Sequence, residues 1–369
     1  MDATDPSGLH SEKWPILDMI RIGAALLVVV GHARYLYFGS PTDVLHTGIG
    51  LRFFYLLTGL SHQAVLCFFV ISGFLVGGSI VRLINEQRFS LWTYLVNRFV
   101  RIYIVFLPAL ALAFVLSVLA SILLVGTSEH LDLLDGWSDF DLPCHLAGLQ
   151  GIACLSHANP PLWSLGYEWL LYLVAPAFLS IVFSSFEGKV RAVALLLCAL
   201  ILYSVLPKQT VWSWFFFWLA GVAAYQILTF CRLPLGVGLA GVLLAAAYPV
   251  ARGLMIPLFA TDICIVIGLI LAFGCQPLMA WKRFDKIFSR LAACSYSLYA
   301  IHLPVIVLCA RVFEWSGEIG PEPEVSARAT VAFVLSVAIA AVVAFAFANA
   351  TEANTSLVRR AILRHSGLK

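Results

Sequence analysis

The sequence predicts an all-α protein that crosses a membrane many times, and two observations support this fold class. Hydrophobic residues make up 61% of the 369 residues and charged residues only 12%, whereas soluble domains carry about 25% charged residues. Apolar runs near or above the roughly 18 residues needed to cross a bilayer recur from Trp14 to Phe347. We therefore expect a polytopic bundle of transmembrane helices, with the lipid bilayer as its main solvent.

Polar segments and Pro- or Gly-rich breaks divide the apolar sequence into about ten expected spans. In chain order they are residues 15–37, 61–81, 102–125, 162–183, 190–206, 211–229, 235–250, 256–273, 291–312 and 328–348. The first run is too long for the apolar core of a signal peptide and contains Arg21 and His32, so we interpret it as a retained first helix.

The distribution of basic residues predicts the orientation of these spans. Most lysines and arginines outside the spans fall in segments on the same side as the amino terminus, so the positive-inside rule places both termini in the cytoplasm and makes the number of spans even. We expect a cytoplasmic segment (1–14), a transmembrane domain (15–348) whose main extracytoplasmic loop is 126–160, and a basic cytoplasmic tail (349–369). The tail is too short to fold into a domain of its own.

The composition also argues against some classes of partner. The net charge of +3 is small and the basic residues are scattered, which argues against nucleic-acid binding. No spacing typical of a metal site occurs, so no metal is expected. Cys144 and Cys154 both lie in the outer loop, where an oxidising compartment permits a disulfide. Two free thiols packed against the bundle are the alternative.

Ionisable side chains inside expected spans are costly and are therefore candidates for function. Arg21 and His32 are eleven positions apart, which places them on one helix face roughly 16 Å apart. Ser164, Glu168 and Tyr172 share a face of the fourth span, and Glu168 lies close to the depth of His32. We expect His32 to act as a base that Glu168 orients or stabilises. A hydrogen bond from His32 to a neighbouring helix, or a structural Glu–Arg pair, are the alternatives.

Two further clusters lie near the inner ends of expected spans. Arg98 and Arg101 are three residues apart and so adjacent on one helix surface, where they favour capture of an anionic cofactor or else reach toward lipid phosphate. Ser295, Tyr299 and His302 fall within about 60° on one face of the ninth span. They form either part of a site or a structural polar seam.

Taken in order, these motifs resemble the acyltransferase-3 family of integral membrane acyltransferases. The family's Arg and His of the first helix are matched by Arg21 and His32, and its Phe-rich run that ends in Ser-Gly-Phe is matched by Phe68–Phe74. Its RxxR motif is matched by Arg98 and Arg101. Its Trp-Ser-Leu-x-x-Glu motif is matched by Trp163–Glu168, and its Ser-Tyr-x-x-Tyr-x-x-His motif is matched by Ser295–His302. One departure is the proline that often soon follows the second Arg, because here Pro108 comes late. Within the Phe-rich run, Gly73 and Gly77 have the spacing of close helix packing.

The resemblance implies transfer of an acetyl or other short acyl group from acyl-coenzyme A to a hydroxyl of a sugar or glycan at the outer side of a bacterial inner membrane. Arg98 and Arg101, with Arg21, are then expected to hold the phosphates of the donor, acetyl-coenzyme A, and no tightly bound cofactor is expected. The substrate-binding residues implied are Ser72, Trp163, Ser164, Tyr299 and His302.

Two alternatives stay open at this point. Transfer is either direct, with His32 as base, or passes through a covalent acyl-His32 intermediate. The competing function is a proton-coupled transporter of a small polar or glycosidic substrate, because buried Arg, His and Glu also line transport pathways. Many relatives carry a further extracytoplasmic domain, which we do not expect here.

Overall fold

A computed structural model describes residues 15–38, 48–127, 133, 137–138, 140–155, 157–183, 209–231, 233–248, 251, 256–274, 285–319 and 326–366. Across these ranges the regular secondary structure is helical, apart from an isolated β-bridge between Gln150 and Cys154. Within the described residues, seven helical segments are long and apolar enough to cross a membrane, and two further apolar helices are shorter. The all-α, polytopic fold predicted from the sequence is therefore confirmed, while the total of ten spans and the cytoplasmic placement of both termini remain predictions.

The helices in chain order are α1 (Pro15–Tyr37), α2 (Ile49–Thr58), α3 (Ser61–Ser72), the π-helix η2 (Gly73–Gly77), α4 (Gly78–Asn85), α5 (Leu91–Leu123), α6 (Asp141–Leu146), the 3₁₀-helix η4 (Pro160–Leu162), α7 (Trp163–Phe183), α9 (Gln209–Phe230), α10 (Leu235–Ala246), α12 (Leu258–Phe273), α13 (Asp285–Trp315), α14 (Ala327–Ala350), the 3₁₀-helix η6 (Glu352–Asn354) and α15 (Thr355–His365). The expected span 190–206 lies outside the described residues, and each of the other expected spans coincides with a helix.

The start of α5 differs from the sequence-based expectation. Helix α5 begins at Leu91 rather than near residue 102 and is capped by the hydroxyl of Ser90, which accepts from the backbone N–H of Thr93. The two arginines of the RxxR motif therefore lie inside the helix instead of at its entrance. The helix also continues through Pro108, so the late proline does not end it.

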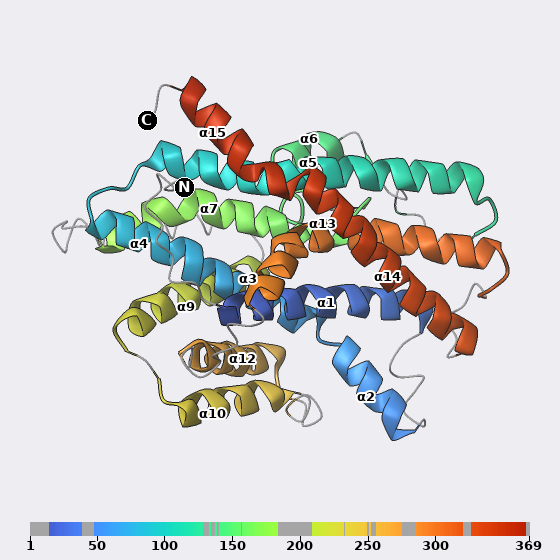
Figure 1. Ribbon diagram of the computed structural model, residues 1–369, viewed down its shortest axis with the longest axis horizontal. Coiled ribbons are helices and arrows are strands. Elements are labelled where there is room, and N and C mark those ends of the chain that lie inside the picture. The colour runs from blue at the N-terminus through green and yellow to red at the C-terminus, as the bar shows by residue number, and fades with distance from the viewer. Residues whose placement is uncertain are drawn as a thin grey trace.

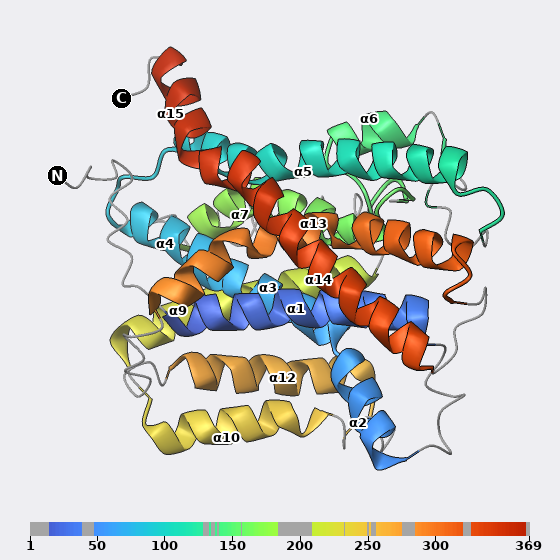
Figure 2. The same cartoon turned by 45° about the vertical axis from the view of Figure 1, so that its right-hand side comes forward.

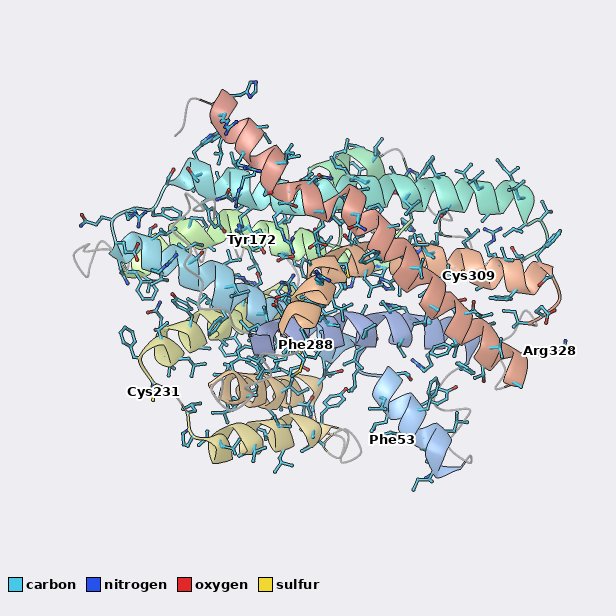
Figure 3. All side chains as sticks on the ribbon, in the orientation of Figure 1. Phe53, Tyr172, Cys231, Phe288, Cys309 and Arg328 are labelled. Carbon is cyan, nitrogen blue, oxygen red and sulfur yellow. A yellow bond between two sulfur atoms is a disulfide. The ribbon has the colours of Figure 1, made fainter. Side chains whose placement is uncertain are left out.

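Helices α2 and α15 were not expected, because both are short and amphipathic and neither has the length of a span. Phe53 on α2 is 61% exposed and lies at the edge of the molecule, whereas Tyr172 on α7 lies inside the bundle (Figure 3). Helix α15 occupies part of the segment expected to be a basic tail.

The axes of most long helices are roughly aligned, and α14 crosses them obliquely (Figure 1). Helix α13 packs against α1, α5 and α14, and α1 also packs against α3. Helices α10 and α12 lie side by side at one edge in both views (Figure 2). Asp18, near the start of α1, and Glu352, just after α14, line one pocket. The start of α1 and the end of α14 therefore lie at the same end of the bundle.

Helices α3 and α9 approach each other closely at glycines. A Cβ atom on Gly73 would meet the backbone of Trp218, and one on Gly221 would meet the carbonyl oxygen of Val70. This close packing is what the Gly73–Gly77 spacing predicted. The π-helical turn that begins at Gly73 follows directly after Ser72, and such turns displace the local backbone and are frequent at functional sites.

The outer loop is fixed by a disulfide and by hydrogen bonds to two helices. Cys144 and Cys154 are bonded, with their Cα atoms 6.3 Å apart, which confirms the predicted bridge. The hydroxyl of Tyr103 on α5 donates to the carbonyl of Leu146, and that of Tyr167 on α7 donates to the carbonyl of Gly151. The disulfide-closed segment therefore packs directly on α5 and α7.

Candidate active site

Three arginines separate two pockets in the interior of the bundle. Arg21 on α1 and Arg98 and Arg101 on α5 line a cavity of about 190 Å³, which we call the central cavity. The same three side chains line a second pocket of about 540 Å³, the end pocket, near the start of α1 and the end of α14. The arginines predicted to bind the donor are therefore brought together, and each is in contact with both spaces.

The central cavity contains the polar residues predicted on α7. The hydroxyl of Tyr172 donates to the Glu168 carboxylate, and the Ser72 hydroxyl donates to the same oxygen atom at 3.4 Å. The indole N–H of Trp218 donates to the Ser72 hydroxyl at 3.2 Å. Ser72 at the end of α3, the half-buried carboxylate of Glu168 and the hydroxyl of Tyr172 thus form one hydrogen-bonded group on the cavity wall.

Ser164 and Tyr299 meet at another part of the cavity wall. Their hydroxyl oxygens lie 2.6 Å apart, and the Tyr299 hydroxyl donates to the carbonyl of Pro161 at 2.8 Å. Because the Tyr299 proton is used in that bond, the Ser164 hydroxyl is the donor between the two side chains. This pair joins α7 to α13, and the role of both residues in substrate binding stays a prediction.

The two histidines of the motifs, far apart in sequence, touch in the core. His302 Nδ1 donates to the carbonyl of Tyr299 at 2.7 Å, which leaves its Nε2 as an acceptor. That Nε2 lies 3.1 Å from His32 Nδ1, which also lies 3.0 Å from the carbonyl of Val28. His32 Nδ1 therefore carries its proton and donates it, and its Nε2 holds a lone pair that is free to accept a proton.

The predicted pairing of His32 with Glu168 is wrong, because a different side chain occupies that position. Helix α1 packs chiefly on α13 and α3, so the imidazole of His32 meets His302, with ring centroids 5.1 Å apart. Glu168 instead accepts from Tyr172 and Ser72 within the central cavity. Similar depth in two helices did not imply contact between them.

Neither histidine lines the central cavity. Tyr299, which does line it, lies three residues before His302 on α13, a rise of roughly 4.5 Å along the helix. The histidine pair is thus one helical turn beyond the cavity wall that Ser164 and Tyr299 form.

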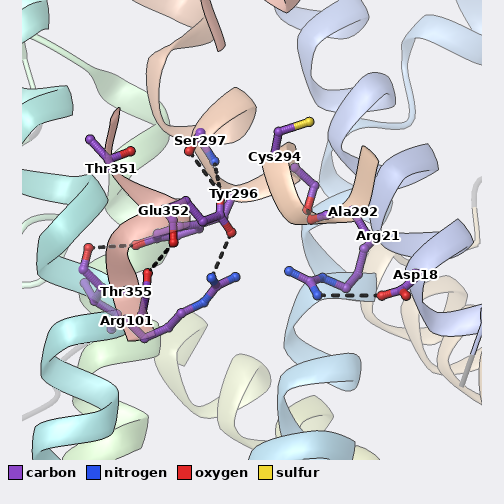
Figure 4. A network of polar contacts seen from close by, with 12 residues as sticks. Asp18, Arg21, Arg101, Ala292, Cys294, Tyr296, Ser297, Thr351, Glu352 and Thr355 are labelled. Atoms are coloured by element: carbon purple, nitrogen blue, oxygen red, sulfur yellow. Dashed lines mark hydrogen bonds and ion pairs between the residues drawn. The ribbon is translucent and has the colours of Figure 1, made fainter. Parts of the chain in front are cut away.

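The three arginines have different partners. Arg101 forms an ion pair with Glu352 at 2.8 Å and lies 5.2 Å from the ring centre of Tyr296 (Figure 4). Arg21 reaches Asp18 at 4.0 Å. Arg98 lies over the rings of Tyr94 and Tyr172, at 5.9 and 5.6 Å from their centres.

Glu352 is a site residue that the sequence analysis missed. Its side chain is buried, and its second carboxylate oxygen accepts from the backbone N–H and the hydroxyl of Ser297 (Figure 4). The sequence placed it in the basic tail. The sequence does hold one sign of it: Glu352 is an acidic residue that follows directly after the last expected span, in a segment otherwise rich in arginine.

Trp163, the residue predicted to contact a sugar, starts α7 beside a cluster of aromatic rings. Its ring centre lies 5.4 Å from that of Trp214 and 5.2 Å from that of Tyr167. Among the described residues, no group of three or more His, Cys, Asp or Glu side chains is placed to hold a metal ion.

Comparison with known proteins identifies the family of the chain. A family model described as an acyltransferase domain matches residues 14–348. An uncharacterized protein of Haemophilus influenzae is 35% identical over 149 residues, which cover 38% of this chain and 56% of that protein, so the match spans about half the length of that relative. No solved structure matches the chain. Because the family model covers nearly the whole sequence, the chain belongs to the acyltransferase-3 family of membrane acyltransferases.

Proposed function

We propose that the protein is an O-acyltransferase that moves an acetyl or other short acyl group from acyl-coenzyme A to a hydroxyl of a sugar or glycan, in a bacterial inner membrane. The observation that carries the proposal is the arginine-lined junction between the end pocket and the central cavity. It offers guanidinium groups to phosphates at one end, and the cavity wall formed by Ser164 and Tyr299 lies one helical turn from the histidine pair.

The donor enters from the end pocket in this proposal. Guanidinium groups fit phosphate oxygens with paired donors, and the junction formed by Arg21, Arg98 and Arg101 supplies several of them. The thioester arm then extends into the central cavity, where most of the lining side chains are apolar. The end of the bundle that holds this pocket is the one predicted to face the cytoplasm, where acyl-coenzyme A is made.

His32 is the base of the proposed reaction. Its Nε2 accepts the proton of the acceptor hydroxyl while the hydroxyl oxygen attacks the thioester carbonyl carbon. The carbon–sulfur bond breaks, and the imidazolium returns the proton to the departing coenzyme A sulfur. His302 fixes the ring by accepting from Nδ1. In the covalent variant, Nε2 attacks the carbonyl carbon and the carbon–sulfur bond breaks, so that coenzyme A leaves as its thiolate. The acceptor hydroxyl oxygen then takes the acyl group from His32, and the hydroxyl proton neutralises the thiolate.

The acceptor binds from the opposite end in this proposal, near the start of α7. The half-buried Trp163 lies there against the buried ring of Trp214, and an indole ring packs well on the face of a sugar. The disulfide-closed loop packs on α5 and α7 beside them and holds this entrance in place.

Inverted membrane vesicles, which expose the cytoplasmic face, test the proposal. They are supplied with acetyl-coenzyme A that carries a label in its acetyl group, and vesicles without the protein serve as control. We expect protein-dependent appearance of the label in base-labile esters of the glycan or glycolipid fraction. Label that stays in acetyl-coenzyme A would contradict the proposal and favour a proton-coupled transporter, which has no reason to break the thioester.

A further inference from the structure

The two arginines of the RxxR motif have unlike surroundings, although the sequence treats them as a pair. Arg101 is held on three sides, by the Glu352 carboxylate at 2.8 Å, by the ring of Tyr296 at 5.2 Å and by its own helix. Glu352 is in turn anchored to α13, because Ser297 donates to it from its backbone N–H at 3.3 Å and from its hydroxyl at 3.0 Å. Figure 4 shows this chain of contacts from α5 through η6 to α13.

Arg98 has no such partner within the described part of the chain. Its guanidinium lies over the rings of Tyr94 and Tyr172, and its Nε is buried without a hydrogen bond. The carboxylate of Glu168 lines the same cavity, but it is engaged by Tyr172 and Ser72. A buried guanidinium N–H without an acceptor is costly, and a phosphate oxygen is an acceptor that would remove this cost.

We infer that Glu352 is a positioning residue that neutralises Arg101 and joins α5 to α13, and that Arg98 is the guanidinium that binds a phosphate group of the donor. The identity of the anion rests on the proposed function. An anion that approached Arg101 would have to displace a carboxylate that two hydrogen bonds already hold, whereas Arg98 offers donors that no carboxylate occupies.

The charge of Glu352 has a second consequence. Glu352 lines the end pocket together with all three arginines, so its negative charge repels an anion that enters there. Removing that charge while keeping the shape, as in Glu352→Gln, should therefore strengthen anion binding and weaken the tie between α5 and α13. If Glu352 served to present Arg101 to the donor, the same change would weaken binding instead.

Four single variants of the full-length protein in lipid nanodiscs separate these roles: Arg98→Met and Arg101→Met, which are matched in size, and Arg101→Lys and Glu352→Gln. The affinity for coenzyme A itself is measured by calorimetry and the unfolding temperature by tryptophan fluorescence. We expect Arg98→Met to lower the affinity at least about tenfold, the loss of one charge-assisted hydrogen bond, with a small change in unfolding temperature. Arg101→Met should weaken binding several-fold less and lower the unfolding temperature more, and Arg101→Lys should recover most of that stability.

Glu352→Gln decides between the two roles of the carboxylate. We expect coenzyme A to bind about twofold more tightly or better, the order of effect expected for removing one nearby negative charge at water-like screening. The unfolding temperatures of Arg101→Met, Glu352→Gln and the double variant should be non-additive, because the two residues share one interaction. The changes in unfolding temperature caused by Arg98→Met and Glu352→Gln should be additive in the double variant, because the two residues share no interaction.

Equal loss of affinity in Arg98→Met and Arg101→Met, or weaker binding in Glu352→Gln, would overturn the inference and assign both arginines and Glu352 to one phosphate site. If Arg101→Met does not fold, the affinities and unfolding temperatures of Arg101→Lys and Glu352→Gln still distinguish the positioning role of Glu352 from a shared phosphate site. If the wild-type protein binds no coenzyme A, the donor assignment fails, whereas additive unfolding temperatures for Arg101 and Glu352 would refute the positioning role alone.

Discussion

His302 Nε2 accepts a hydrogen bond from His32 Nδ1 across 3.1 Å, and this contact links the first helix to α13 over 270 positions of sequence. Since His302 donates its own Nδ1 proton to the carbonyl of Tyr299, the hydrogen bonds run in one direction from His32 to His302 to the backbone. The arrangement sets the tautomer of His32 and leaves its Nε2 as the free basic atom.

The first prediction concerns His302. Replacement by Leu removes the acceptor for His32 Nδ1, so the ring of His32 loses its orientation and its preferred tautomer. We expect the rate of acyl transfer to fall roughly 100- to 10,000-fold, the range associated with loss of a positioned base or its orienting partner. His365→Leu is the matched control, because His365 is exposed on α15 and its Nδ1 lies 2.9 Å from the carbonyl oxygen of Ala361 in the same helix. An unchanged rate in His302→Leu would show that the pair has no part in transfer.

The second prediction tests the packing of α3 on α9. In Gly73→Ala the added methyl group meets the backbone of Trp218, which cannot move aside as a flexible side chain would. We expect a loss of about 1–3 kcal/mol of stability, measured as a lower unfolding temperature. Gly23→Ala is the control, since nothing lies within 4 Å of a Cβ at that position. Equal unfolding temperatures for the two variants would contradict the close approach of the two backbones.

The third prediction concerns the bridge between Cys144 and Cys154. In denatured, unreduced protein neither thiol should react with a labelling reagent, and both should react after reduction. Cys231 is free and exposed, so it should label under both conditions and serves as the internal control. Replacing both bridge cysteines by Ser should cost roughly 2 to 3 kcal/mol of loop stability by the chain-entropy estimate. Labelling of both cysteines before reduction would show that the bond is absent.

The fourth prediction follows from His145, which lies in α6 outside the membrane-spanning helices. Burial lowers the pKa of His145 below its usual value, so the folded loop binds a proton less tightly than the unfolded loop does. The resulting stability is present above the ordinary histidine pKa of about 6.5 and is lost as the pH falls below it.

Reduction of the disulfide by a phosphine reductant measures this loss of stability. We expect faster reduction at pH 5 than at pH 7.5, and His145→Gln should remove most of the difference. The pKa of Asp141 is also lowered: burial opposes the shift, but hydrogen bonds from Ser138 outweigh it. Its ordinary pKa is about 3.9, so its contribution is lost only at still lower pH. Equal reduction rates at pH 5 and pH 7.5 would contradict this account of the loop.

The sequence predicted the helices well because span length and apolar content are local properties. The expected first span coincides with α1, and the faces that carry Ser164, Glu168 and Tyr172 follow from helical spacing alone. Helices α2 and α15 escaped prediction because a short amphipathic helix has neither the length nor the uniform apolarity of a span.

The site was predictable in its residues and only partly in its contacts. Depth along a helix can be counted from the sequence, and His32 and Glu168 do lie in neighbouring parts of the interior. Which helix lies beside which depends on packing between distant segments, so the contact of His32 with His302 could not be derived by counting. The contact of Glu352 with Arg101 could not be predicted for the same reason, because only the fold brings the end of α14 against α5.

The most direct test of the central claim compares wild-type protein with His32→Ala in identical lipid bilayers that contain a bacterial glycolipid extract. The rate at which coenzyme A thiol is released from acetyl-coenzyme A is measured, and the unfolding temperature of each protein is recorded. The account predicts release by the wild type and at least about a hundredfold slower release by a folded His32→Ala, the contribution of a general base. Equal rates in the two folded proteins would contradict the role of His32, and no release by folded wild-type protein would contradict the acyl-coenzyme A donor.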